Sequence, residues 1–201
     1  LLNLEKHKKK IMKMLKMIRY VSGEQLRNDF LAAGVHEGGI FIVHSAIGKV
    51  GWISGGIESV AEILMDIIGP TGTLLMPVFT FSLRDWGQPP YNVLRTPSRT
   101  GKLTEFFRKL PGVMRSAHPT HSVAAWGALA HEFLEPGIES YPPLGQGSPL
   151  DLARQAGAKI LLLGVNQDRN STVHLAEHMA GMPYLSVSFR VGADHDIAWY
   201  T

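Results

Sequence analysis

A strand, a glycine-rich loop, a helix and a second strand follow one another between residues 39 and 81, and this order leaves few folds open. Residues 39–44 are a short apolar run that predicts a buried strand, and residues 57–68 repeat apolar side chains at helical spacing. Residues 73–81 are a second apolar run; Pro77 interrupts it, so we expect its latter half to be edge or loop. The pattern predicts a βαβ unit with two parallel strands.

The remaining residues continue the alternation of strands and helices. We read residues 45–56 as a glycine-rich loop and residues 82–97 as a long loop. Helices are predicted over 21–33, over 101–110 with Thr100 as cap, over 128–134, from Ser148-Pro149 to Gly157, and over 172–180; strands are predicted over 122–126, 159–165 and 185–191. Residues 159–165 form the clearest buried strand of the three. The expected fold is a single α/β domain, a mixed central sheet flanked by helices.

Positive charge is concentrated at the start of the chain. Seven of the 20 basic residues, but only Glu5 of the 17 acidic ones, lie in residues 1–20, so the rest of the chain has a net charge of −3. Because the chain after residue 20 has no excess of basic residues, we expect no nucleic-acid partner. We divide the chain into a basic extension or helix, residues 1–20, and the domain, residues 21–201; the extension could also be a membrane-surface helix or a transit-like segment.

Composition narrows the chemistry further. The chain has no cysteine, which excludes disulfides, a thiol nucleophile and thiolate metal sites. It has no run of 18 apolar residues, so we expect no membrane span. The absence of cysteine fits a reducing compartment, and we expect a cytoplasmic protein.

Residues 174–178 read His-Leu-Ala-Glu-His and follow a predicted strand. His174 and Glu177 are three residues apart, so on a helix their side chains share a face. A carboxylate beside an imidazole fixes its tautomer and raises its basicity, as a general base requires. The alternative is a surface His–Glu pair of no functional importance.

The same five residues also match the H-x-x-E-H motif of inverted zinc peptidases. A zinc site needs a third ligand, for which only Asp194 and His195 follow, and Gly181 and Pro183 end the helix early. We therefore expect no metal, and keep a zinc hydrolase as the alternative enzyme.

Residues 115–122 read Arg-Ser-Ala-His-Pro-Thr-His-Ser and combine a guanidinium, three hydroxyls and two imidazoles. Such a segment can bind a phosphate or line a polar pocket. The alternative is a loop whose side chains satisfy its own backbone. The glycines between residues 48 and 56 precede a helix and offer an anion site, although they match neither the dinucleotide nor the P-loop motif.

Taken in order, nine segments resemble the aminoglycoside 3-N-acetyltransferase family, and the similarity runs from about Gly23 to the end. They are His44-Ser45-Ala46 with Gly48 and Gly51; Gly55-Gly56; residues 69–74; residues 97–101; residues 110–112; residues 115–122; residues 147–149; residues 161–165; and residues 174–177. Any one of them is unspecific, but nine in the right order are not.

The resemblance implies transfer of an acetyl group from acetyl-CoA to an amine, typically the 3-amino group of a 2-deoxystreptamine aminoglycoside, and hence a role in antibiotic resistance. It implies the family's α/β fold, distinct from the common N-acetyltransferase fold, and a cationic small molecule as partner. His174 and Glu177 match the catalytic pair. Coenzyme-binding roles are expected for Ser45, Ala46, Ser98, Arg99, Thr100, Arg115, Ser116, His118, Pro119, Thr120 and Ser122, and substrate-binding roles for Asp85 and His121.

Three features depart from the family. Its chains run well past the point that matches Thr201, which suggests a C-terminally incomplete domain; Ala46 stands where Ser is frequent; and the lysine-rich start is not a family feature. A remnant that binds coenzyme A without catalysis is therefore a further alternative. Ser45, its neighbouring backbone N–H groups or Thr120 could stabilise the thioester oxygen, and Arg115 with Arg99 could meet coenzyme phosphates. The acceptor amine and the oligomeric state stay open.

Overall fold

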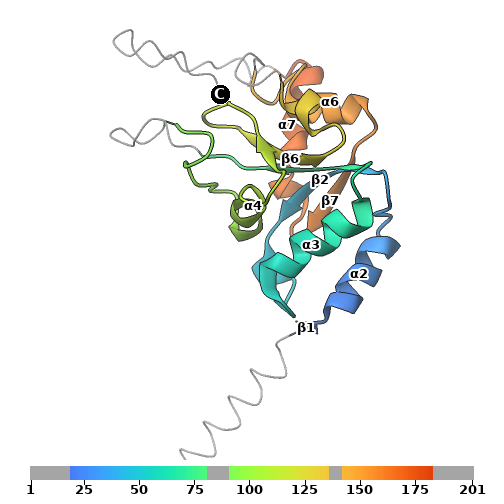
Figure 1. Ribbon diagram of the computed structural model, residues 1–201. Helices are drawn as coiled ribbons and strands as arrows, with labels where there is room; N and C mark the ends of the chain where they lie inside the picture. Colours follow the sequence, from blue (N-terminus) through green and yellow to red (C-terminus); the bar gives the residue numbers. More distant parts are fainter. Residues whose placement is uncertain (1–18, 81–90, 136–141, 183–201) are drawn as a thin grey trace, which may run out of the picture.

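A five-stranded mixed sheet forms the centre of the molecule (Figure 1). The structure is a computed structural model that describes residues 19–80, 91–135 and 142–182. The strand order is β5-β6-β4-β2-β7, with β2 at Ile40–Ser45, β4 at Thr73–Pro77, β5 at Met114–Arg115, β6 at Val123–Gly127 and β7 at Lys159–Leu163. Strand β2 runs parallel to β4 and β7, whereas β6 is antiparallel to β4 and β5. The predicted mixed sheet and its βαβ unit are confirmed.

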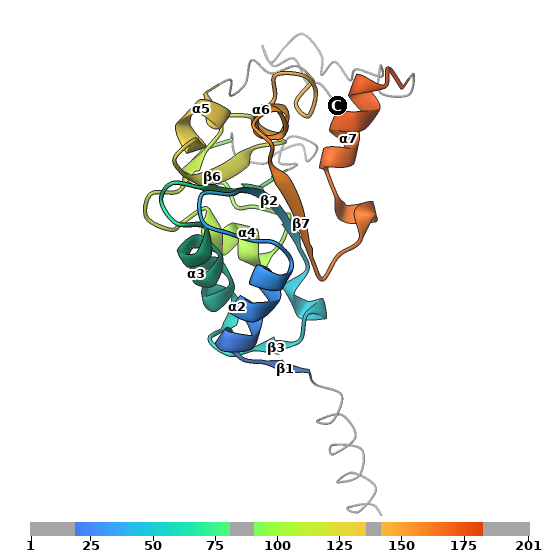
Figure 2. The ribbon, with the colours of Figure 1, turned by 90° about the vertical axis from the view of Figure 1, so that its right-hand side faces the viewer.

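Helices cover both faces of this sheet (Figure 2). Helices α2 (Gly23–Ala32), α3 (Gly56–Ile68) and α4 (Lys102–Phe107) lie on one side, and α5 (Ala130–Leu134) and α6 (Pro149–Gln155) on the other. Successive strand residues point to opposite faces. Phe41 and Val43 of β2 accordingly pack in the core beneath α2 and α3, whereas Ile42 between them packs in the core beneath α5 and α6.

Helix α3 owes its position to its apolar stripe. Val60 and Leu64 are fully buried, and Ile67 is 7% exposed, as the helical spacing predicts. Each such side chain contributes about 1.5–3 kcal/mol on burial. Gly69 ends the helix at a positive φ of +66°, where a Cβ would be strained. The helix therefore returns the chain to the start of β4, beside β2.

The exposure of strand β7 contradicts the prediction of a buried strand over residues 159–165. Lys159 and Ile160 are exposed, and the rest of the strand is half-buried. Strand β2 covers one edge of β7, and none of the strands that the structure describes pairs with the other edge. An apolar run of this length cannot distinguish a central strand from an edge strand.

The glycine-rich loop contains more structure than expected. Residues Ile47–Lys49 form a 3-10 turn, η1, and Trp52–Ile53 form strand β3, which pairs in parallel with β1 at Tyr20–Val21. Strand β1 takes Val21 out of the helix predicted over 21–33. Helix α2 begins at Gly23 instead, where the Ser22 hydroxyl accepts the N–H of Gln25.

Two further expectations near the site are corrected. Thr100 does not cap α4, because its hydroxyl donates to the carbonyl of Pro77, and Gly101 precedes the helix with no side-chain cap. Pro77 ends β4 as expected, but β4 lies between β2 and β6 and is no edge strand. Arg115 belongs to a strand, β5. The predicted strand 185–191 and the extension 1–20, except its last two residues, lie outside the described residues.

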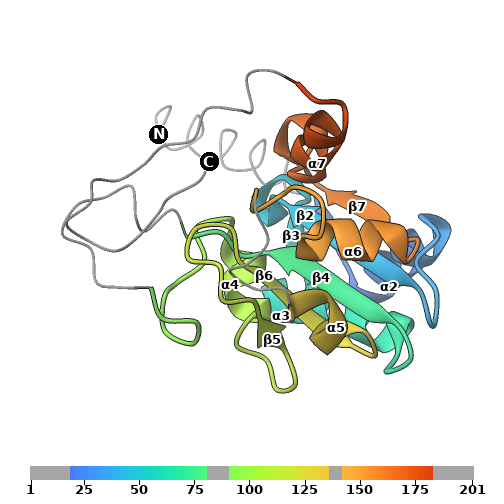
Figure 3. The same cartoon turned by 90° about the horizontal axis from the view of Figure 1, so that it is seen from above.

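Strands β2, β4 and β7 are parallel, so their carboxyl ends meet at one edge of the sheet (Figure 3). In open α/β sheets this edge is where ligands bind. After β7 the chain forms a 3-10 turn, η3 (Gln167–Arg169), and then α7 (Thr172–Met179). Within the described ranges, no helix is long and apolar enough to cross a membrane.

Candidate active site

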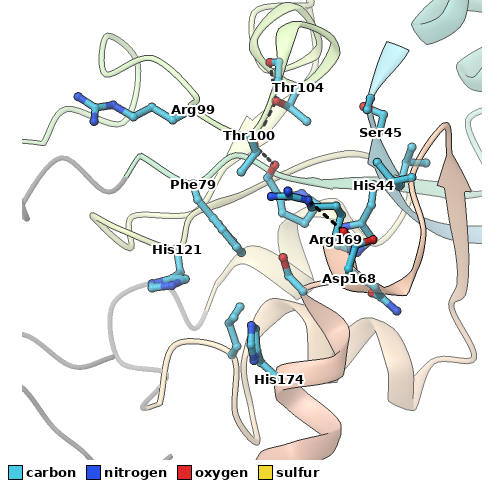
Figure 4. Close-up of a pocket in the computed structure, with 18 of the residues that line it drawn as sticks. His44, Ser45, Phe79, Arg99, Thr100, Thr104, His121, Asp168, Arg169 and His174 are labelled. Atoms are coloured by element: carbon cyan, nitrogen blue, oxygen red, sulfur yellow. Dashed lines mark hydrogen bonds and ion pairs between the residues drawn. The ribbon is translucent and has the colours of Figure 1, made fainter. Parts of the chain in front are cut away.

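A cavity of about 710 Å³ opens at this edge of the sheet (Figure 4). Residues at the ends of β2 and β4 and residues that follow β2, β4 and β7 form its walls, together with the start of α4 and α7. Its lining includes His44, Ser45, Ala46, Lys49, Phe79, Arg99, Thr100, Thr104, His121, Leu144, Asp168, Arg169, Asn170 and His174. Six of these were predicted from the sequence as site residues: Ser45, Ala46, Arg99, Thr100, His121 and His174.

The His174–Glu177 pair lies in the geometry that the motif predicts. The Nδ1 atom of His174 is 2.8 Å from a carboxylate oxygen of Glu177. An ionised carboxylate only accepts hydrogen bonds, so Nδ1 carries the proton and Nε2 is left as the acceptor. The His174 side chain is 57% exposed and lines the cavity, whereas that of Glu177 is 24% exposed. The pair thus presents a basic nitrogen to whatever occupies the cavity.

The start of α7 places His174 at the end of β7. The Asn170 carboxamide oxygen accepts hydrogen bonds from the backbone N–H and the hydroxyl of Thr172. Asn170 and Thr172 are both buried. Leu175 is 2% exposed and anchors the other face of the helix. With one face of the first turn packed in this way, His174 is left to face the cavity.

The end of β2 contributes His44 and Ser45. His44 is 5% exposed, and burial lowers the pKa of its imidazole from the usual 6.5 to about 4, so the ring is neutral at pH 7. The sequence assigned a coenzyme role to Ser45 but none to His44. The only signal for His44 was its place in a motif, because an apolar strand readily buries a structural histidine.

Hydroxyl groups form a network at the start of α4. The hydroxyl of Ser98 lies 2.8 Å from that of Thr100 and 3.0 Å from that of Thr104, and the Thr100 hydroxyl donates to the Pro77 carbonyl at 2.6 Å. This network ties α4 to the end of β4 and holds Thr100 on the cavity wall. Arg99 lines the same wall, and Arg99 and Ser98 also line a neighbouring open cavity of about 520 Å³ with Lys102.

Arg115 is used inside the protein. Its guanidinium donates four hydrogen bonds, one to the Ser122 hydroxyl and three to the backbone carbonyls of Val78, Val93 and Thr96. It also lies over the ring of Tyr91, 5.3 Å from the centroid. These contacts fix loops on each side of β5 and argue against the expected contact with coenzyme phosphates.

Of residues 115–122, only His121 lines the cavity. The Ser116 hydroxyl accepts the N–H of Val123, the Ser122 hydroxyl donates to the carbonyl of Val78, and the Pro119 carbonyl accepts from Thr80. These groups hold the segment to β6 and to the residues that follow β4, whereas His118 accepts hydrogen bonds from the backbone of the segment itself, as the alternative reading expects. The coenzyme roles expected for Ser116, His118, Pro119, Thr120 and Ser122 remain predictions that their positions do not favour.

His118 shows how this segment is built. It is 8% exposed, and burial lowers the pKa of its imidazole to about 4. Its Nδ1 atom accepts the backbone N–H of His121 at 3.0 Å and lies 3.3 Å from the N–H of Thr120. A buried neutral histidine therefore shapes the turn that presents His121 to the cavity. The ring of His121 packs edge-on against that of Phe79.

Several cavity residues were not anticipated, among them Lys49, Asp168 and Arg169. Lys49 lies in η1 and the other two in η3, short turns that the sequence presented as loops without a motif. Asp85, expected to bind substrate, lies outside the described residues. So do Asp194 and His195, the possible zinc ligands; among the residues that are described, no three His, Cys, Asp or Glu side chains group to hold a metal.

Known proteins resemble this chain over most of its described length. The family model for aminoglycoside 3-N-acetyltransferase matches residues 42–193. An aminoglycoside N(3′)-acetyltransferase-like protein of Bacillus subtilis is 32% identical over 184 residues, covering 82% of this chain and 66% of that protein. Aminoglycoside N(3)-acetyltransferase IV of Salmonella is 37% identical over 160 residues, covering 80% and 60%. The chain thus spans less than two thirds of the length of these relatives.

Solved structures agree with the sequence matches. A binary complex of AAC-IIIb with CoASH has a TM-score of 0.71 and 32% identity, covering 82% of this chain and 67% of that one. A histidine-to-alanine variant of AAC(3)-IVa in complex with apramycin has a TM-score of 0.73 and 33% identity, covering 84% and 66%. The predicted fold class is confirmed, since the described strands and helices superpose on this group of structures.

Proposed function

Because the chain belongs to the aminoglycoside 3-N-acetyltransferase family, we propose that it transfers an acetyl group from acetyl-CoA to an amine of a cationic small molecule. The acceptor that we propose is the 3-amino group of a 2-deoxystreptamine aminoglycoside. The observation that carries this proposal is the His174–Glu177 pair on the wall of the cavity at the carboxyl ends of β2, β4 and β7. A relative in complex with CoASH and another in complex with apramycin support the two ligand classes.

His174 acts as the general base. An amine attacks a thioester only when its nitrogen lone pair is free, and Nε2 of His174 is the acceptor that removes the proton. Glu177 keeps the proton on Nδ1 and stabilises the imidazolium that forms. The C–N bond forms as the C–S bond breaks, and His174 returns its proton to the departing sulfur, so the imidazole ends neutral.

Acetyl-CoA supplies the acetyl group as a thioester, and the cavity residues fit its polar parts. Lys49, Arg99 and Arg169 line the cavity with positive charge that suits phosphate groups. Ser45 and Thr100 add uncharged hydroxyls. With Arg115 committed to internal hydrogen bonds, we assign the phosphate contacts to Arg99 and its cavity neighbours instead.

A cationic acceptor needs negative charge nearby. Asp168 lines the cavity next to Arg169, with 3.4 Å between its carboxylate and the Nε of Arg169. Glu177 adds a second carboxylate beside His174. We propose that these two acids attract the amine and that His121, which lines the same cavity, contacts it.

The test is turnover with defined substrates. The protein is mixed with acetyl-CoA and a 2-deoxystreptamine aminoglycoside, thiol release is followed, and the position of the acetyl group is read by NMR. We expect release that depends on both substrates and acetylation at the 3-amino group. Acetylation at another amine would show that the proposed acceptor is wrong. No thiol release with any amine would contradict the proposed transferase activity.

Binding of the coenzyme without turnover is the second candidate. Calorimetry with coenzyme A and the thiol-release assay together separate the two, because binding alone would give heat on titration but no thiol from acetyl-CoA. The family assignment favours the transferase over a zinc hydrolase, whose further ligands would have to come from Asp194 or His195.

A further inference from the structure

Two polar atoms at the end of β2 stand out within the described part of the chain. Nε2 of His44 and the hydroxyl oxygen of Ser45 are buried and have no hydrogen-bond partner among the described residues. Both residues line the cavity. They are neighbours in sequence at the carboxyl end of a strand that pairs with β4 on one side and β7 on the other.

Such an arrangement is costly in the absence of a ligand. The large majority of buried side-chain polar atoms in proteins have a partner, because the hydrogen bond to water lost on burial must be replaced. Two unsatisfied atoms from consecutive residues that line one cavity, at the ligand-binding edge of a parallel sheet, therefore point to a group that binds there.

The charge of the missing partner follows from the environment. His44 is 5% exposed and its imidazole is neutral, with a pKa of about 4 that results from burial. Nε2 of a neutral imidazole can donate or accept one hydrogen bond, a hydroxyl can donate one and also accept, and neither group carries a charge that would balance a charged ligand. Burying a phosphate or an ammonium group against them would leave that charge unpaired, whereas an uncharged carbonyl or amide fits both.

We propose that His44, with Ser45, binds an uncharged carbonyl or amide group of the acyl donor's pantetheine arm. The inference rests on the proposed function, because the thioester and the two amides of that arm are the uncharged carbonyl and amide groups of acetyl-CoA. Both atoms are covered in the ligand-free molecule, so the inference includes a local shift of these side chains as the arm binds.

Calorimetry on two substitutions at one position tests the inference. His44→Met fills similar space without a polar atom at the ring edge, and His44→Gln keeps a polar group of similar reach. The probes are coenzyme A, pantetheine and adenosine 3′,5′-bisphosphate. We expect His44→Met to weaken coenzyme A and pantetheine about tenfold, or about 1.4 kcal/mol, to leave the bisphosphate unchanged, and we expect His44→Gln to recover most of the loss.

Thermal unfolding separates binding from a structural role. Replacing an unsatisfied buried group by an apolar one is neutral or stabilising, so His44→Met should melt at or above the parent temperature. Unchanged affinity for coenzyme A and pantetheine, equal weakening of the bisphosphate, or a melting temperature several degrees lower would each overturn the inference. A parent protein that binds neither coenzyme A nor pantetheine would instead contradict the proposed function itself.

Discussion

Two regions rich in histidine, helix α7 and residues 115–122, have opposite relations to the cavity. In α7, His174 is 57% exposed, paired with one carboxylate and open to a ligand. Along residues 115–122, His118 and Ser116 are buried and Arg115 is held by four hydrogen bonds within the protein. The segment with more polar groups is thus the more structural one, because its groups serve each other and nearby backbone.

The largest contrast is expected between activity and stability at His174. His174→Ala should lower kcat by roughly a hundred- to ten-thousand-fold, because the general base is removed, with little change in melting temperature for an exposed side chain. Thiol release from acetyl-CoA measures the loss. His178→Ala, on the same helix but outside the cavity lining, is the matched control; equal losses in both variants would remove His174 from this role.

For Arg115 we expect the reverse, a large loss of stability with little change in kcat. Arg115→Met removes the donor to the buried Ser122 hydroxyl and to the carbonyls of Val93 and Thr96, and one of two donors to the Val78 carbonyl, which should cost about 3 kcal/mol of unfolding free energy. Urea denaturation measures this cost, and kcat should stay within a few-fold where the variant is folded. Arg99→Met is the comparison: we expect a higher KM for acetyl-CoA and little change in stability. A large rise in KM for Arg115→Met alone would restore the coenzyme contact to Arg115.

A substitution of Glu177 tests how much the carboxylate assists His174. Glu177→Gln keeps an acceptor for Nδ1 of His174 but removes the charge that stabilises the imidazolium, so we expect a loss in kcat of about tenfold, smaller than for His174→Ala. Steady-state kinetics of both variants give the ranking. The reverse order would identify the carboxylate as the primary base.

Replacing His118 should have the smallest effect at pH 7, because its effect on the unfolding free energy appears only in acid. Its folded pKa of about 4 is below the unfolded value of 6.5, so the unfolded chain binds more protons between these values and stability falls as pH drops through this window. His118→Asn keeps a short acceptor for the turn and cannot titrate. Between pH 7 and pH 5 it should lose about 2 kcal/mol less than the parent; identical losses in urea titrations would show that His118 does not contribute.

Local patterns accounted for the elements whose cause is local. The apolar stripe of α3 follows from spacing along one helix, the Ser148 cap of α6 from two adjacent residues, and the His174–Glu177 contact from a separation of three residues. Contacts between distant residues were missed: Tyr20–Val21 pairs with Trp52–Ile53 across 32 positions, and Arg115 reaches the carbonyl of Val78 across 37. No periodicity along a single segment encodes such partners.

By itself the sequence determined the alternation of strands and helices, the parallel unit around α3, the family and the shared face of His174 and Glu177. Only the tertiary structure decided which polar groups meet the cavity, that β7 is more exposed than its residues suggest, and that His44 is buried with a nitrogen that no described residue hydrogen-bonds. The reason is physical. Helix and strand periods depend on neighbours a few residues apart, whereas solvation, and with it the charge and availability of a side chain, depends on every segment that packs around it.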